Sequence, residues 1–115
     1  MTTPSDQLLE LIAVRLRAMG NPVRLQILHE LQDGELSVNE ILSAVGGSQA
    51  NVSKHLNVLR GVDLVTRRRD GVNIYYGIAD TSVLEICRTV CDSLIDRATA
   101  NKAVLEQGRA SILRD

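Results

Sequence analysis

Apolar residues recur at helical spacing along most of this chain, and breaks that contain glycine divide the pattern into segments. The first segment, residues 5–19, has apolar side chains three and four positions apart and predicts an amphipathic helix. The next begins with Asn21 as an N-cap and Pro22 at the first helical position, and it ends at Asp33 and Gly34. We therefore expect two helices in the first third of the chain.

Two short capped helices follow, and a pair of glycines separates them. Ser37 and Glu40 have the spacing of a capping box, in which each side chain accepts a hydrogen bond from the backbone N–H of the other residue. This predicts a helix over residues 38–45, and Ser48 is the N-cap of the next helix, which Gly61 ends. Two capped helices joined by a tight turn are typical of a helix-turn-helix.

The pattern then changes from helical to extended. Segments 62–66 and 72–78 are rich in β-branched and aromatic residues and flank an Asp-Gly turn, so they predict a two-stranded hairpin. Helical spacing returns over residues 81–106, where apolar positions alternate three and four residues apart as in a coiled-coil seam. We expect residues 107–115 to be a frayed tail because the pattern weakens there.

The chain of 115 residues has the length of one domain, which we expect to span residues 1–106. Two tyrosines with no phenylalanine or tryptophan require an aliphatic core and disfavour a base-stacking platform for single-stranded nucleic acid. The formal charge is −1, yet residues 48–77 carry five Lys or Arg side chains against two Asp. The expected fold class is mainly α with a small β-hairpin wing, a winged helix-turn-helix of five helices whose DNA-reading part spans residues 37–78.

The sequence also indicates a compartment and excludes some classes of protein. Charged residues interrupt the apolar positions of the N-terminal segment, which predicts neither a signal peptide nor a membrane span. Two cysteines without a secretion signal indicate a reducing compartment, so we expect a cytoplasmic protein with no membrane partner. The sequence holds no nucleophile triad, phosphate loop or paired-carboxylate motif, and an enzyme is not expected.

The helix expected after Ser48 has the features of a helix that reads the major groove. An apolar stripe of Val52, Leu56 and Leu59 faces inward and leaves polar and small side chains on the other side. Amides can pair with adenine edges, while Ser and Lys can reach bases or phosphates. The residues expected to contact DNA are Ser48, Gln49, Ala50, Asn51, Ser53, Lys54, His55, Asn57 and Arg60 on this helix and Arg67, Arg68 and Arg69 on the hairpin.

Two of these residues have an alternative role. His55 lies on the flank of the apolar stripe, and we favour a hydrogen-bonded packing histidine over a base-reading one. Successive side chains of a strand alternate between faces, so at most two of the three hairpin arginines can follow one phosphate strand, and Arg68 can instead cover the sheet.

Four stretches, NPVRLQILHEL, LSVNEIL, SQANVSKHLNVLRGVDLVTRRRDG and IYYGIAD, together resemble the ArsR/SmtB family of bacterial winged-helix repressors. The resemblance covers about residues 8–98. It implies a homodimer formed by the helices over residues 5–19 and 81–106, binding to an inverted-repeat operator in double-stranded DNA, and release when an effector binds. The residues expected at the dimer interface are Leu9, Ile12, Leu16, Leu84, Cys87, Cys91 and Leu94.

The effector sites best known in that family are missing from this sequence. The family's arsenite pattern, ELCVCDL, has cysteines where this chain has Ser37 and Asn39, which cannot replace thiolates. The family's zinc pattern on the last helix, D-x-H-x10-H, corresponds here to Asp80, Ser82 and Ser93. The persulfide sensors have a cysteine near the end of the second helix, where this chain has His29 or its neighbours.

Cys87 and Cys91 remain as candidates for an effector site. Their spacing places both on one helical face with Cβ atoms roughly 5–6 Å apart, too far for a disulfide within an undistorted helix. Both also fall on the apolar seam, where a cysteine can pack as a small hydrophobic residue. Three roles stay open: packing, binding of As(III) or a soft divalent metal ion, and redox or persulfide sensing between subunits.

A DNA-binding repressor is thus the function we expect, and a winged-helix module used only for protein contacts is the alternative. A protein-docking surface would carry exposed leucine or aromatic side chains on the reading helix. This sequence instead has Ala50, Ser53, Lys54 and Asn57 there, which favours DNA.

Overall fold

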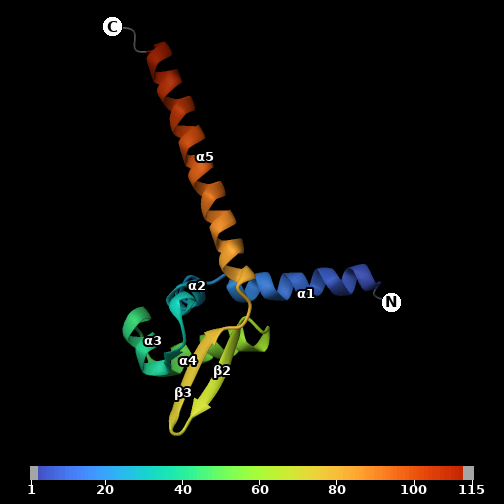
Figure 1. The fold of residues 1–115 in the computed structure, drawn as a ribbon. Coiled ribbons are helices and arrows are strands. Elements are labelled where there is room, and N and C mark those ends of the chain that lie inside the picture. The colour runs from blue at the N-terminus through green and yellow to red at the C-terminus, as the bar shows by residue number, and fades with distance from the viewer. Residues whose placement is uncertain (1–2, 113–115) are drawn as a thin grey trace. The chain divides into compact units, whose positions relative to one another are not determined.

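The computed structural model describes residues 3–112, which form two compact units: the chain up to Thr81, and the helix that begins at Ser82. In the first unit four α-helices precede the β2–β3 hairpin (Figure 1). The helices are α1 (Pro4–Met19), α2 (Pro22–Glu30), α3 (Val38–Val45) and α4 (Gln49–Gly61), with a 3-10 turn, η1, at Leu31–Asp33. The four helices predicted for this part of the chain are confirmed.

In the first unit, a polar residue that precedes each of the four α-helices determines where it begins. Asn21 accepts hydrogen bonds from two backbone N–H groups of α2 through Oδ1, at 2.9 and 3.1 Å. The predicted capping box of α3 is present, because the Ser37 N–H donates to Glu40 Oε1 at 3.0 Å and the Glu40 N–H to Ser37 Oγ at 3.2 Å. A second capping box, between Thr3 and Asp6, begins α1 and was not predicted.

The sheet has three antiparallel strands, one more than predicted. Strands β2 (Val65–Asp70) and β3 (Asn73–Ile78) form the expected hairpin, and β1 (Leu36–Ser37) pairs with the other edge of β3. Residues 62–64, predicted as strand, instead form the connection after α4, where Asp63 has a positive φ of 58°. A strand of only two residues shows no alternation, which is why the sequence did not predict β1.

An aliphatic core lies between the helices and the sheet of the first unit. Ile27 and Leu28 of α2, Ile41 of α3, and Leu56 and Leu59 of α4 are almost fully buried. Burying one such side chain contributes about 1.5–3 kcal/mol to folding. This core holds α3 and α4 against α2 and thereby fixes which face of α4 is exposed.

The second unit is the single helix α5 (Ser82–Ile112). It begins where the sequence predicts but continues past residue 106, so the tail expected to fray from residue 107 is helical as far as Ile112, and residues 113–115 lie outside the described part of the chain. The weak apolar pattern after residue 106, which includes Gly108, does not end the helix. A glycine within a helix costs only about 1 kcal/mol relative to alanine, which the neighbouring turns can offset.

Candidate nucleic-acid interface

The helix α4 presents two chemically distinct faces. Its stripe of Val52, Leu56 and Leu59 is fully buried, as predicted. The opposite side is exposed and mostly polar, with Val58, at 36% exposure, as its large apolar side chain. We call the exposed residues Gln49, Ala50, Asn51, Lys54 and Asn57 the α4 polar face.

Three further residues predicted to contact DNA lie beside this face. Arg60, in the last turn of α4, is exposed. Ser53 is half-buried, so it is less accessible than its neighbours on the polar face. Ser48 is exposed but caps the helix, because its Oγ accepts a hydrogen bond from the Asn51 N–H at 3.1 Å. The hydroxyl of Ser48 therefore already has a structural role.

The turn between α3 and α4 leaves the first residues of α4 accessible. Gly46 and Gly47 both have positive φ, 76° and 83°, a conformation that L side chains rarely adopt. The turn is therefore tight, and Gln49, Ala50 and Asn51 at the start of α4 are all exposed. Because the amino end of a helix carries a partial positive charge, this end of α4 attracts phosphate groups.

The hairpin arginines divide between the two faces of the sheet. Arg67 pairs with Tyr76 and Arg69 with Ile74 in the β2–β3 register, so these two arginines share one face. Both are exposed at the far end of the hairpin. They are the two cations that this face of the wing can present to a phosphate backbone.

Arg68 lies on the opposite face and covers the sheet, the alternative role expected for it. Its Nε donates to Glu35 Oε2 at 2.9 Å, and its guanidinium carbon lies 4.9 Å from the centroid of the Tyr75 ring. The hydrogen bond and the charge of Glu35 raise the pKa of Arg68. Arg68 thus holds the hairpin against the segment before β1. No sequence pattern predicts Glu35 as its partner, because the two residues lie 33 positions apart.

A polar cleft of about 190 Å³ lies between the start of α3, the start of α4 and the hairpin. Asn39, Gln49 and Asn73 contribute amides to it. Asn39 and Asn73 were not predicted as site residues. They are brought beside the α4 polar face only by the fold, since the two residues lie far apart in the sequence.

His55 does not belong to the exposed face. Only 9% of the residue is accessible, and its Nδ1 lies 3.2 Å from Nη1 of Arg24 in α2. Burial, together with the charges of Arg24 and Lys54, lowers the pKa of His55. His55 is therefore corrected from a predicted DNA contact to the packing histidine that was favoured as its alternative.

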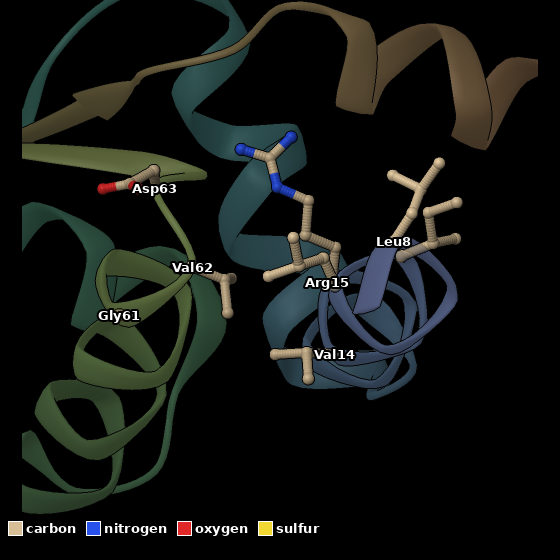
Figure 2. A pocket seen from close by; sticks show the side chains of 8 residues that line it. Leu8, Val14, Arg15, Gly61, Val62 and Asp63 are labelled. Atoms are coloured by element: carbon tan, nitrogen blue, oxygen red, sulfur yellow. The ribbon is translucent and has the colours of Figure 1, made fainter. Parts of the chain in front are cut away.

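The apolar face of α1 is uncovered in a single chain. Leu9, Ile12 and Leu16, predicted at a dimer interface, are 63%, 45% and 51% exposed. Beside them lies an open groove of about 420 Å³ between α1 and the turn after α4, with Leu8 and Val14 on the α1 side and Val62 on the other (Figure 2). The groove is lined by Leu8, Leu11, Ile12, Val14, Arg15, Gly61, Val62 and Asp63.

Helix α5 carries the predicted seam and both cysteines. Leu84 and Cys87 are half-buried, whereas Cys91 and Leu94 are exposed, Leu94 at 63%. Both cysteines are free thiols. Within residues 3–112, no group of three or more His, Cys, Asp or Glu side chains is placed to hold a metal ion.

None of the helices described over residues 3–112 is long and apolar enough to cross a membrane.

Known proteins resemble this chain in both sequence and fold. A family of helix-turn-helix domains matches residues 19–68. The nodulation protein NolR of Rhizobium meliloti is 42% identical over 83 residues, which cover 72% of this chain and 68% of NolR. The HTH-type transcriptional regulator KmtR of Mycobacterium tuberculosis is 34% identical over 108 residues, which cover 94% of this chain and 80% of KmtR.

A solved structure extends the similarity to three dimensions. It is the solution structure of the homodimeric winged helix-turn-helix DNA-binding domain Mb0332 from Mycobacterium bovis, described as a possible ArsR-family transcriptional regulator. The two chains superpose with a TM-score of 0.74 at 31% identity, over 84% of this chain and 93% of that domain.

Proposed function

Because this chain belongs to the ArsR/SmtB family of winged helix-turn-helix transcriptional regulators, we propose that it binds an inverted-repeat operator as a homodimer and represses transcription until an effector releases it. The members of this family are DNA-binding proteins and not enzymes. The α4 polar face is the observation that carries the proposal.

The α4 polar face fits the major groove in size and chemistry. A helix of 13 residues is about 20 Å long, and the major groove admits one α-helix. Asn51 and Asn57 offer amides that can pair with adenine, and Lys54 offers a cation for a guanine or a phosphate. Ala50 leaves room for close approach to the bases. Arg67 and Arg69 on the wing supply contacts to the DNA backbone, which set the register of α4 without reading sequence.

A homodimer explains why two helices of the chain expose apolar residues. Leu9, Ile12 and Leu16 of α1 form a row at helical spacing, and Leu94 extends a similar row on α5. A second copy would cover these rows and remove their apolar surface from water. Two copies related by a two-fold axis would place two α4 helices in successive turns of one DNA face, about 34 Å apart.

For the effector, we propose a soft ligand that the thiols of Cys87 and Cys91 bind. Cys91 is exposed and Cys87 is half-buried one turn before it, so a small species can reach both sulfurs. As(III) is one such species, because each As–S bond replaces an As–OH bond and the thiol proton leaves as water. Since both residues lie on the row proposed to form the dimer, a ligand there would change the spacing of the two α4 helices.

Selection of binding sites from random duplex DNA tests the proposal. The purified chain is mixed with a pool of random duplexes, bound duplexes are amplified, and binding to the enriched sequence is measured by fluorescence anisotropy. We expect an enriched inverted repeat that binds two chains, with an affinity that falls steeply as salt rises. A pool without enrichment, or a single chain bound to an asymmetric site, would overturn the proposal.

A further inference from the structure

Arg24 is a cation in the first turn of α2, and its contacts with the end of α1 explain why a cation is tolerated there. It is the third residue of α2, where the partial positive charge of the helix terminus disfavours a cation. Its side chain does not extend into solvent. It turns to the end of α1, where Nε donates to the Ala18 carbonyl and Nη2 donates to the Arg17 carbonyl at 3.3 Å. These carbonyls lie in the last turn of α1, where the negative end of the helix dipole favours a cation.

The third contact of Arg24 reaches α4. Its Nη1 lies 3.2 Å from Nδ1 of His55, which is almost fully buried. A guanidinium has only donors, so Nδ1 must be the acceptor and the imidazole must be neutral with its proton on Nε2. One side chain thus joins the carboxyl end of α1, the start of α2 and the middle of α4.

We infer that Arg24 is a positioning residue for DNA binding: through His55 it fastens α4 to the end of α1, and the contact holds only while the His55 imidazole is neutral. The inference rests on the proposed function, since α4 is the helix proposed to enter the major groove. We refer to this contact as the Arg24–His55 link.

The place of His55 on α4 makes the link relevant to the polar face. His55 follows Lys54 directly and lies one turn after Asn51, so it is surrounded on its own helix by residues proposed to contact DNA. Contacts with base edges need side chains held within about 0.5 Å of the productive geometry. Loosening α4 from α1 would therefore weaken base contacts even though neither residue of the link touches DNA.

Protonation of His55 breaks the link because it converts Nδ1 from a hydrogen-bond acceptor into a donor. A protonated imidazole has donors on both nitrogens, so Nδ1–H would face the donors of Arg24. The charges that act on the ring are those of Arg24 from α2 and Lys54 from α4, and both are positive. Burial, together with these two charges, lowers the pKa of His55 below its ordinary value, so the link is intact at neutral pH and is lost only when the pH falls through that lowered pKa.

The sign of this pH effect separates it from the general effect of acid. Acid neutralises carboxylates, which makes any protein more positive and strengthens its nonspecific attraction to DNA. Loss of the link predicts the opposite, a weaker affinity at acidic pH. A fall in affinity as the pH passes through the His55 pKa is therefore diagnostic when it disappears in a variant without His55.

The first arm of the test uses the free chain and needs no DNA. Nitrogen-15 NMR at pH 7.5 should find His55 with its proton on Nε2, and the same measurement at falling pH gives the pKa of the ring. Below that pKa, the backbone amides of α4 should be less protected against hydrogen exchange than at pH 7.5, after correction for the intrinsic pH dependence of exchange. Arg24→Lys keeps the charge but cannot reach all three acceptors, so its α4 amides should exchange fast already at pH 7.5. Arg17→Lys is the matched control, because the Arg17 side chain is exposed and pairs with Glu10 on the same helix. It should behave as the unmodified chain does.

The second arm measures affinity for the selected duplex. Arg24→Lys should bind about tenfold more weakly at pH 7.5, and the unmodified chain should weaken similarly on acidification. In His55→Gln the amide can still accept from Arg24 but cannot be protonated, so affinity should no longer fall with pH. A proton on Nδ1, or a pH response that survives in His55→Gln, overturns the inference. If no duplex is selected, the proposed function fails while the first arm still decides the link.

Discussion

Arg68 and Tyr75 face each other across the β2–β3 ladder, with the guanidinium carbon 4.9 Å from the ring centroid. The same guanidinium donates to Glu35 at 2.9 Å. The charge of Arg68 therefore interacts with the sheet and with Glu35, while its neighbours Arg67 and Arg69 share the other face and are exposed. Three consecutive arginines thus have two different roles.

We predict that Arg67→Ala weakens binding to all DNA sequences to a similar extent. Removing one phosphate contact should reduce the slope of log affinity against log salt concentration by about one. Fluorescence anisotropy at several salt concentrations measures this slope.

Arg68→Ala is the matched comparison, because it removes the same charge from the adjacent position. It should leave the slope nearly unchanged and lower the melting temperature slightly through loss of its exposed ion pair and ring contact. Equal slope changes in the two variants would contradict the division of roles.

Substitutions on the α4 polar face should separate affinity from specificity. Lys54→Ala should weaken binding across sequences and flatten its salt dependence, whereas Asn57→Ala should mainly relax the preference at one position of each half-site, by about 1–3 kcal/mol. Repeating the DNA selection with each variant shows which positions lose information. Lys102→Ala on α5 is a control for charge, since its side chain is 77% exposed. Unchanged binding by Lys54→Ala would refute the assigned face.

The capping box of α3 should make the stability of the helix-turn-helix depend on pH. Hydrogen bonds from Ser37 lower the pKa of Glu40. A lowered pKa in the folded state means that the contribution is fully present above the ordinary glutamate pKa and is lost as the pH falls through the lower folded value. Ser37→Ala should cost about 1 kcal/mol at pH 7, measured by urea denaturation. Glu40→Gln should reduce the loss of stability on acidification below about pH 4.5. An unchanged acid profile would show that the box contributes nothing.

Local sequence signals predicted the helices well because caps act over three or four residues. The side-chain oxygens of Asn21, Ser37 and Ser48 each accept a hydrogen bond from a backbone N–H of the first turn, and each of these residues marks a helix start correctly. The buried stripe of α4 followed from spacing alone. N-caps and apolar spacing both depend on residues that are close together in the sequence, so these helices can be predicted without knowledge of the tertiary structure.

Features that depend on distant residues could not be predicted in the same way. The Arg24–His55 link joins positions 31 residues apart, and Glu35 meets Arg68 across 33 residues. The only local signal was a cation at the start of α2, where it is unfavourable unless something outside the helix holds it. Strand β1 exists because Leu36 and Ser37 happen to pass the edge of β3, which no pattern over two residues can reveal.

The thiol proposal predicts a loss of response without a loss of DNA binding. The variant with both Cys87→Ser and Cys91→Ser should bind the selected duplex normally, while As(III) or Cd(II) should no longer dissociate it. The unmodified chain should be released by at least one member of a panel of As(III), Cd(II), Zn(II), peroxide and polysulfide, followed by anisotropy. Full release of the double variant would assign the two cysteines to packing alone.

The central claim is that two α4 helices read the major groove, and methylation interference tests it most directly. Methylation of guanine N7 marks the major groove, and methylation of adenine N3 marks the minor groove. On the selected duplex, we predict that N7 methylation blocks binding in two clusters about 10 base pairs apart, and that Lys54→Ala or Asn57→Ala weakens this pattern. Binding that is insensitive to N7 methylation, or blocked only from the minor groove, would contradict the placement of α4.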